Sequence, residues 1–329
     1  MVDIKETDVV VAGGGPAGAI AARLLARHGR QVTLVDPGSC ATDRLEVLPP
    51  SACLVLQALD LVDTLHDPRV GRPCLGIRRR WGAMAPEFDD FLRRPGSAGY
   101  VVDRARFDVR LRTAASEAGV RMIRGRVVAA QCVGERIQVS IRTCDGDLIL
   151  AAGVAVDATG RPALLARRLG ARRRVMERLV AVRSENSHAN NADDQPTWLE
   201  VQSLGQNWSY RVAGPGGRFE TWSVRRGEDR SRRLVGRSIN ASSVRLSPAA
   251  GVRWIAVGDA AMSFDPITSQ GLVSAFTTAL AAGDSVMSSR GLDSETAHAF
   301  SQSVTATAHN SEAGRRAVYQ ALTVGQNGA

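Results

Sequence analysis

The sequence predicts an α/β fold in which a Rossmann-like sheet-and-helix domain is interrupted by an antiparallel sheet and followed by a C-terminal helical segment. A strand, a glycine-rich turn, a helix and a second strand follow one another within residues 8–36. Two later apolar strands, residues 154–157 and 254–257, end in Asp-Ala-Thr-Gly and Gly-Asp-Ala-Ala turns. Residues 175–250 hold strand-like segments instead of helical ones.

The N-terminal unit has the pattern of a dinucleotide-binding turn. A β-branched strand leads into Gly-Gly-Gly-Pro-Ala-Gly at residues 13–18, and an Ala- and Leu-rich helix follows. Gly13 allows the tight turn, Gly15 lets the backbone approach a pyrophosphate, and Gly18 lets the helix pack closely on the strand. The helix N-terminus offers free N–H groups to the phosphates. Asp36, at the end of the second strand, is placed to accept hydrogen bonds from the adenosine ribose.

The composition excludes several chemistries. The 329 residues contain 42 Lys and Arg against 33 Asp and Glu, a formal charge of +9, and Lys5 is the sole lysine. A central lysine, as in a Schiff base or a P-loop, is therefore excluded. The five Cys and five His are scattered without ligand spacing, which predicts no metal site and reduced thiols in a cytoplasmic protein. We interpret the arginine excess as mostly background, and we expect no nucleic-acid module, signal peptide or membrane span.

The later strand ends make a family resemblance specific. Residues 154–161 read VAVDATGR, residues 254–261 read WIAVGDAA, and residues 265–272 read DPITSQGL ahead of a predicted helix. Together with the N-terminal unit they resemble the FAD-dependent aromatic hydroxylase superfamily, and within it flavin-dependent halogenases and halogenase-like monooxygenases. The resemblance implies FAD as cofactor. Asp259 would then accept from an FAD hydroxyl, and the helix N-terminus would face the flavin N1–C2=O edge.

Two further segments resemble flavin-side motifs of this superfamily. Residues 44–51, RLEVLPPS, resemble its Gly-Glu-x-Leu-Pro-Pro segment, with Arg44 in place of the glycine. Residues 100–108, YVVDRARFD, resemble a helix start whose arginine lies close to FAD. The motifs together predict these cofactor-binding residues: Gly13, Gly15, Pro16, Ala17, Gly18, Asp36, Glu46, Arg104, Asp157, Gly160, Asp259, Pro266, Gln270 and Gly271.

Aromatic residues mark the predicted substrate side. Trp208-Ser209-Tyr210 resembles a tryptophan-containing motif of the superfamily, and Trp222 follows in the next strand-like piece. We predict that an antiparallel sheet roofs the flavin, with Cys74, Trp208, Tyr210 and Trp222 as candidate substrate-pocket residues. An ordinary sheet core explains each aromatic residue equally well.

The resemblance implies a monooxygenase that acts through a flavin C4a-hydroperoxide, so that the cofactor carries the chemistry and no catalytic triad is required. The catalytic residue is left unassigned, with Glu46, Ser269 and Gln270 as candidates, and His66 fits a surface position better than a base. Molecular oxygen is the expected co-substrate. NAD(P)H is expected to reduce the flavin, either directly or through a partner flavin reductase.

The single lysine separates two kinds of enzyme within this resemblance. Halogenases of the superfamily use a pocket lysine, whereas the corresponding position here is Cys74 and Lys5 lies ahead of the first expected strand. We therefore predict hydroxylation of an indole- or tryptophan-type substrate, either a small molecule or a tryptophan in a peptide or protein, as in tryptophylquinone maturation. A halogenase, an isoprenoid-lipid reductase of the geranylgeranyl type and a non-catalytic FAD-binding protein are the alternatives.

The motif positions also predict how the chain is divided. Residues 119–151 read as hairpin strands that support the cofactor domain. Residues 184–195 form a polar run inside the predicted roof. The predicted parts are an FAD-binding domain of residues 1–70, 99–174 and 251–290, a substrate-side segment of residues 71–98, a substrate-facing sheet of residues 175–250 and a C-terminal helical segment of residues 291–329.

Overall fold

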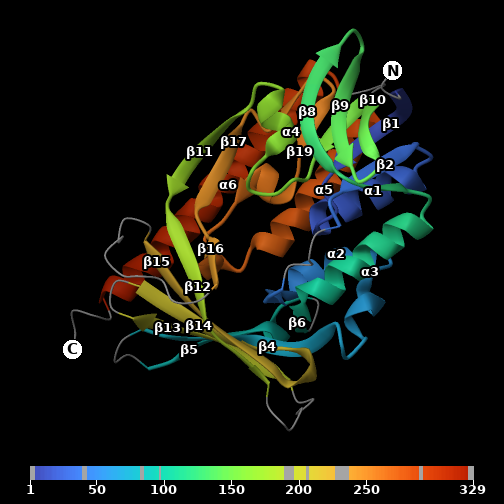
Figure 1. Cartoon of the computed structure of the whole chain (residues 1–329). Coiled ribbons are helices and arrows are strands. Elements are labelled where there is room, and N and C mark those ends of the chain that lie inside the picture. The colour runs from blue at the N-terminus through green and yellow to red at the C-terminus, as the bar shows by residue number, and fades with distance from the viewer. Residues whose placement is uncertain are drawn as a thin grey trace.

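The computed structural model describes residues 4–38, 43–81, 85–95, 98–188, 196–204, 207–226, 237–288 and 292–324, and these form two large sheets and one small one. Five parallel strands make the centre of the first sheet, in the order β19, β10, β1, β2 and β7 (Figure 1). Strands β18, β8 and β9 pair antiparallel at its margins. The bounds are β1 (Ile4–Ala12), β2 (Val32–Asp36), β7 (Arg121–Arg124), β8 (Arg126–Val133), β9 (Arg136–Thr143), β10 (Gly146–Asp157), β18 (Ala250–Gly251) and β19 (Trp254–Ala256).

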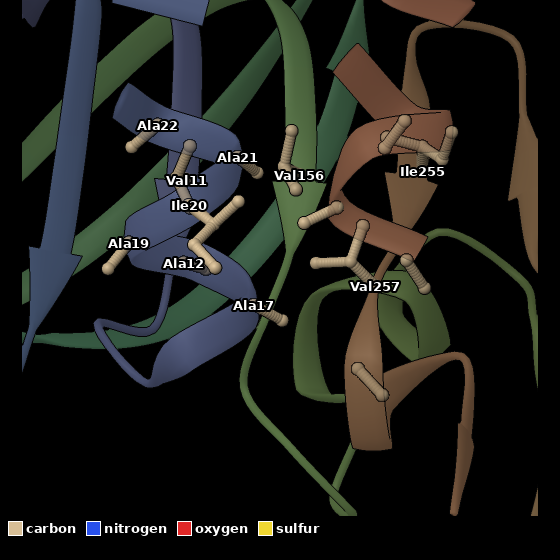
Figure 2. Packing of buried hydrophobic residues seen from close by; sticks show 14 of the residues in the cluster. Val11, Ala12, Ala17, Ala19, Ile20, Ala21, Ala22, Val156, Ile255 and Val257 are labelled. Atoms are coloured by element: carbon tan, nitrogen blue, oxygen red, sulfur yellow. The ribbon is translucent and has the colours of Figure 1, made fainter. Parts of the chain in front are cut away.

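Helices bury this sheet because its strands are apolar on both faces, as is typical of parallel sheets. Val11 of β1 and Ile20 of the first helix are each at most 1% exposed. Val11 lies opposite Val156 of β10, which in turn lies opposite Ile255 of β19, and all four belong to one apolar core (Figure 2). Phe107 and Phe276, with ring centroids 6.4 Å apart, join two further helices. The helices of this part are α1 (Pro16–Arg27), α2 (Pro50–Ala58), α3 (Arg104–Glu117), α4 (Leu164–Arg168) and α5 (Gly271–Ser288), with a 3-10 turn η1 (Val62–Leu65).

The second sheet has its own apolar core and draws strands from distant parts of the chain. Its order is β16, β12, β15, β14, β13, β4, β6 and β3, with β5 beside β4. All of its pairs are antiparallel except that of β13 with β4. The bounds are β3 (Leu45–Leu48), β4 (Gly71–Arg80), β5 (Glu87–Asp90), β6 (Gly99–Asp103), β12 (Leu179–His188), β13 (Thr197–Leu204), β14 (Asn207–Ala213), β15 (Arg218–Arg226) and β16 (Arg237–Asn240), with 3-10 turns η2 (Phe91–Arg93) and η3 (Pro215–Gly217).

A small sheet and a long terminal helix connect the two large sheets. The small sheet has the order β11 (Arg172–Glu177), β17 (Ser243–Ser247) and β20 (Met262–Ser263). Helix α6 (Ser294–Val324) runs beside it, contacts β18 of the first sheet, and places Val318 and Tyr319 against the core of the second (Figure 1). Two short turns, η4 (Gly258–Ala260) and η5 (Pro266–Thr268), lie between β19 and α5. No helix in the described ranges is long and apolar enough to cross a membrane.

The predicted fold class is confirmed, while several details differ from the sequence interpretation. The first strand begins at Ile4 instead of residue 8, so Lys5 lies inside β1 and not ahead of it. The last hairpin strand and the strand ending in Asp-Ala-Thr-Gly are one continuous strand, β10, which pairs with β9 on one side and β1 on the other. β3 and β6 fall within the predicted cofactor domain, but β6 pairs with β4 and β3 pairs with β6, so both belong to the second sheet. Most of the polar run expected at residues 184–195 lies outside the described residues.

Candidate functional site

Three strand ends converge at the N-terminus of α1. A Cβ at Gly13, whose φ is +106°, would stand 2.2 Å from the Ala158 carbonyl oxygen at the end of β10. A Cβ at Gly18 would stand 1.9 Å from the Gly13 carbonyl oxygen, and a Cβ at Gly258 would stand 2.8 Å from the Ala17 methyl group. Glycine is therefore required at these positions, because any side chain would force the strand ends apart.

Gly15 differs from its neighbours, and the difference fits a bound phosphate group. A Cβ at Gly15 would meet no atom of the described residues within 4 Å, and its φ of −71° suits any residue. Gly15 is the N-cap of α1, its cap has no side-chain hydrogen bond, and Pro16 begins the helix. Open space in front of uncapped helical N–H groups is the arrangement that binds a pyrophosphate. The predicted roles of this loop therefore agree with its geometry.

Asp36 lies beside the same loop at the end of β2. Its Oδ2 accepts from the Gly14 N–H at 2.8 Å, and its Oδ1 accepts from the Gly38 N–H at 2.8 Å. Arg112 of α3 donates to the Gly14 carbonyl at 3.1 Å. These bonds fix the carboxylate next to the phosphate-binding loop, where each oxygen keeps a further lone pair for a ribose hydroxyl.

Asp157 and Gly160 shape the second strand end. Asp157 is fully buried, its Oδ1 accepts from the Thr159 N–H and hydroxyl at 2.9 and 2.6 Å, and its Oδ2 accepts from the Ala166 N–H at 2.7 Å. Burial raises the pKa of this carboxyl group, and the hydrogen bonds oppose that rise. Asp157 thus holds the turn and the start of α4, and its predicted contact with a cofactor stays a prediction. Gly160, with φ +73°, completes the turn.

The third strand end carries Asp259, which is partly exposed. Arg161 places its Nε 3.5 Å from Asp259 Oδ2 and donates to Ser263 Oγ at 3.0 Å. Burial lowers the pKa of the Arg161 guanidinium, Asp259 opposes this effect, and the nearby Arg44 and Arg173 add to it. Sequence reasoning did not single out Arg161, although it directly follows the Asp-Ala-Thr-Gly motif.

A buried ion cluster brings together residues from β3 and α3. Arg104 donates to both oxygens of Asp108 at 2.8 and 3.0 Å, and it forms an ion pair with Glu46, which also accepts from Arg44 at 3.0 Å. Burial disfavours the charge on both groups. The charges of Arg44 and Arg104 outweigh burial at Glu46 and lower its pKa, and those of Asp108 and Glu46 outweigh burial at Arg104 and raise its pKa. A Cβ at Gly271 would stand 3.2 Å from Glu46 Oε1, so this cluster borders the N-terminus of α5. The predicted cofactor residues Glu46, Arg104 and Gly271 therefore lie together.

The loop ahead of α5 is fixed by Asp265, which sequence reasoning passed over. Its Oδ1 accepts from the Ile267 N–H at 3.0 Å, and its Oδ2 accepts from the Tyr319 hydroxyl of α6 at 2.9 Å. The same hydroxyl accepts from Trp208 Nε1 at 3.1 Å. Burial raises the pKa of Asp265 to about 6. This chain of hydrogen bonds joins the second sheet, α6 and the loop.

Two candidate catalytic residues, Ser269 and Gln270, follow Pro266 in this loop. Ser269 adopts a left-handed backbone with φ 49°, which side-chain-bearing residues rarely do and which is concentrated at functional sites. Gln270 Oε1 accepts from Ser311 of α6 at 2.8 Å, so this side chain is already engaged in a contact that holds α6. The geometry favours a positioning role for Gln270 and leaves Ser269 as a candidate.

Of the aromatic candidates, only Tyr210 is partly exposed. Trp208 and Trp222 are 2% and 1% exposed and belong to the core of the second sheet. Tyr210 lies between them, 5.7 Å from the Trp208 ring and stacked 6.4 Å from the Trp222 ring. Burial, together with the charges of Glu46 and Glu220, raises the pKa of Tyr210, and Arg44 opposes this. Tyr210 therefore lies near enough to Arg44 and Glu46 of the ion cluster to be influenced by their charges.

Three other residues singled out in the sequence lie away from an accessible pocket. Cys74 is fully buried in the second core, its thiol donates to the Gly76 carbonyl at 3.5 Å, and burial raises its pKa to about 11. His66 is exposed beside Asp63, which agrees with the predicted surface position. Lys5 lies eight residues before Gly13 on an extended strand, about 26 Å from the loop.

Comparisons with known proteins support the flavin assignment. Residues 6–131 match a family model described as an FAD binding domain. The FAD-dependent oxidoreductase LodB of Marinomonas mediterranea is 27% identical over 316 residues, which cover 84% of this chain and 83% of that protein. A menaquinone reductase of Mycobacterium tuberculosis is 30% identical over 304 residues, which cover 80% of this chain and 72% of that protein.

Solved structures share the fold at lower identity. The flavin-dependent brominase Bmp2 superposes with a TM-score of 0.80 at 18% identity, covering 92% of this chain and 84% of that one. The peptidyl tryptophan dihydroxylase QhpG, described as essential for tryptophylquinone cofactor biogenesis, superposes with a TM-score of 0.71 at 23% identity, covering 91% and 72%. With the open Gly15 cradle and the three converging strand ends, these findings identify the chain as an FAD-dependent oxidoreductase that belongs to the aromatic hydroxylase superfamily.

Proposed function

We propose that this oxidoreductase is a monooxygenase that hydroxylates an aromatic substrate of the indole or tryptophan type, either free or within a peptide or protein. The observation that carries the proposal is the half-buried Tyr210, whose ring is held against two buried tryptophans. An aromatic ring fixed in this way offers a flat wall for stacking a planar substrate. QhpG, which shares the fold, is described as acting on peptidyl tryptophan.

The chain's own residues divide the work between holding the cofactor and shaping the substrate side. Bound FAD supplies the oxygen-transfer chemistry. The uncapped N–H groups behind Gly15 would hold its pyrophosphate, and Asp36 its ribose. The N-terminus of helix α5 lies beside the Glu46 cluster, and the positive end of the helix dipole there would stabilise negative charge on a bound flavin. The contacts of Asp265 with Tyr319 and Ile267 would keep the intervening loop rigid and exclude water.

Halogenation is the first alternative, because Bmp2 shares the fold. The lysine expected of a halogenase has no counterpart near the loop. Lys5 is about 26 Å away along β1, and the thiol of Cys74, at the corresponding position, is buried and cannot act as an amine. These observations favour oxygen insertion over halide transfer.

Reduction of an isoprenoid double bond is the second alternative, and the 30% identity to a menaquinone reductase favours it specifically. Such a reaction would consume no oxygen and would need an apolar tunnel for the chain of the substrate. The Tyr210 ring, backed by the buried tryptophans, suits a planar ring better than a long aliphatic chain.

The decisive experiment supplies the FAD-loaded protein with a chemical reductant, oxygen and bromide, and offers indole, tryptophan and a tryptophan-containing peptide. The proposal expects a product that is heavier by one or two oxygen atoms, and mass spectrometry detects it. Tyr210→Phe should keep the activity, and Tyr210→Leu should raise KM more than it lowers kcat, because the stacking wall is lost. A bromide-dependent product without oxygen insertion would overturn the proposal. Reduction of menaquinone in a parallel anaerobic reaction, with no oxygenated aromatic product in the first, would overturn it as well.

The electron donor is a separate part of the proposal. We infer that NAD(P)H reduces the flavin, either by docking transiently or through a partner flavin reductase, with oxygen as the co-substrate. Anaerobic mixing of the FAD-loaded protein with NADPH, while the flavin absorbance is followed, separates the two routes. Rapid bleaching without added reductase rejects the need for a partner.

A further inference from the structure

An arginine-lined groove lies outside the flavin site, between α4 and β11. Its volume is about 770 Å³, and it is lined by Arg167, Arg168, Arg172 and Arg173, with Leu164 and Val175 among its apolar walls. This volume is within the range of small-molecule sites, roughly 300–1,000 Å³. The sequence interpretation treated these arginines as background, but the fold gathers them on one concave surface.

The chain segment that lines the groove carries basic residues without acidic ones. Between Asp157 and Glu177 the chain carries six arginines and no acidic residue. Within the part of the chain that the structure describes, Arg168, Arg172 and Arg173 form no ion pair, and Arg173 Nε is buried without a hydrogen-bond partner. Arg168 and Arg172 are exposed and Arg173 is half-buried, whereas the buried Arg104 is neutralised by two carboxylates.

Local capping does not explain the cluster either. The last carbonyl groups of α4, which could attract basic side chains, already accept from backbone N–H groups of Leu169, Gly170 and Ala171. Among the described residues, Arg167 makes one long hydrogen bond, 3.4 Å to the Pro162 carbonyl. The guanidinium groups therefore have donors to spare, and holding like charges together costs free energy unless an anion is bound.

The positive field extends from the groove to the flavin side. Arg173 is among the groups that lower the pKa of Arg161, after burial and Arg44. Arg161 in turn contacts Asp259 at the third strand end. The groove and the cofactor site are thus electrostatically connected through the turn that follows Asp157, while they are lined by different residues.

We propose that this groove binds the diphosphate group of a nucleotide-type ligand other than the FAD held at α1. Guanidinium groups pair with phosphate oxygens in a bidentate manner, and four of them suit two phosphates better than one. The walls formed by Leu164 and Val175 would receive an apolar or planar part of the ligand, against which an arginine can also stack. The inference does not depend on which substrate is oxidised.

The test uses the FAD-saturated protein, so that the α1 site is blocked, and measures binding of ADP, inorganic pyrophosphate and NADPH by titration calorimetry. One saturable site for ADP is expected, weakened by added salt. Arg168→Ala and Arg172→Ala should each weaken ADP binding about tenfold, because each removes a charge-assisted hydrogen bond. Arg121→Ala is the matched control, since Arg121 is an exposed arginine of β7 outside the groove, and it should bind ADP as the natural sequence does.

The three ligands separate the sources of the diphosphate. If pyrophosphate and ADP bind with comparable affinity, the phosphates alone are recognised. If ADP binds more tightly than pyrophosphate, the groove also contacts the nucleoside. If NADPH binds more tightly still, the groove holds the reductant. All three outcomes support the proposal. The absence of saturable ADP binding overturns it, as does ADP binding that neither groove variant weakens when melting curves show both variants folded. The calorimetry measures ligand binding without turnover. A failed hydroxylation assay would therefore count against the proposed function and not against the proposed nucleotide site.

Discussion

Tyr319→Phe is the substitution that most directly tests how α6 is fastened to the flavin-side loop. It removes one hydroxyl group and leaves the ring, so the packing of Tyr319 against the second core is kept. The hydroxyl donates to Asp265 at 2.9 Å and accepts from Trp208 at 3.1 Å. Its partners are 1% and 2% exposed, so water has little access to replace it.

The expected cost follows from these two contacts. A buried polar group left without its partner costs about 1–3 kcal/mol, and here one donor and one acceptor are orphaned together. The free energy of unfolding should therefore fall by about 2–5 kcal/mol, a large share of the roughly 5–15 kcal/mol of a typical domain. The loss should be larger above pH 6, where Asp265 is ionised and the bond to it is charge-assisted.

Urea denaturation of the FAD-loaded protein, followed by tryptophan fluorescence, measures this loss. Tyr100→Phe is the matched control, because Tyr100 is half-buried in β6 and no hydrogen bond from its hydroxyl is found among the described residues; a change within about 0.5 kcal/mol is expected. The reasoning is refuted if Tyr319→Phe is as mild as Tyr100→Phe at pH 8, since α6 would then be held by apolar packing alone.

Three further predictions concern the cofactor loop, the ion cluster and the buried acid. Gly15→Ala should leave the melting temperature of the FAD-free protein nearly unchanged, because no atom of the described residues lies within 4 Å of the added Cβ. It should nevertheless weaken FAD binding at least about tenfold, as measured by flavin fluorescence quenching, and an unchanged FAD affinity would contradict the phosphate-binding role of this loop. Arg104→Gln should lower the free energy of unfolding by about 3–5 kcal/mol in urea titrations, because it leaves two carboxylates without their buried cation, and a loss below about 1 kcal/mol would argue against that cluster. Because the pKa of Asp265 is raised from 3.8 to about 6, the folded chain binds its proton more tightly than the unfolded chain, so this residue's contribution to stability should fall by about 3 kcal/mol as pH rises from about 3 to about 7. The difference in stability between the natural sequence and Asp265→Asn should follow that pH course, and a flat difference would contradict it.

The cofactor loop could be predicted from the sequence because its determinants are local. Gly13, Gly15 and Gly18 lie within six residues, and their roles follow from backbone conformation and close approach alone. The strand ends at Asp157 and Asp259 were recognisable for the same reason, since each directly follows a short apolar run. Such signals do not depend on the rest of the fold.

The contacts that fasten the substrate side could not be predicted in this way. Tyr319 and Asp265 are 54 residues apart, and Trp208 and Tyr319 are 111 apart, so no periodicity or spacing links them. The sequence predicted the aromatic residues as candidates, but it could not separate the buried Trp208 and Trp222 from the partly exposed Tyr210. All three lie on the same face of the adjacent strands β14 and β15, so the two-residue period of a strand treats them alike. The sequence interpretation divided the continuous strand β10 into two strands. Its first part pairs with β9 as a hairpin and its later part pairs with β1 in parallel, and the two kinds of pairing have different sequence patterns.

The strand order of the first sheet also determines when the cofactor site can form during synthesis. β1 carries the glycine loop, but its neighbour β10 is made more than 130 residues later, and β19, whose end supplies Gly258, follows near residue 254. The second sheet is equally delayed, because the Leu45 N–H donates to Glu220, 175 residues away. A ribosome must therefore have delivered about four-fifths of the chain before FAD can find its complete binding loop, and during that time the apolar strand β1 has unpaired edges. Nascent chains of this protein should accordingly depend on protection from aggregation until β19 has emerged.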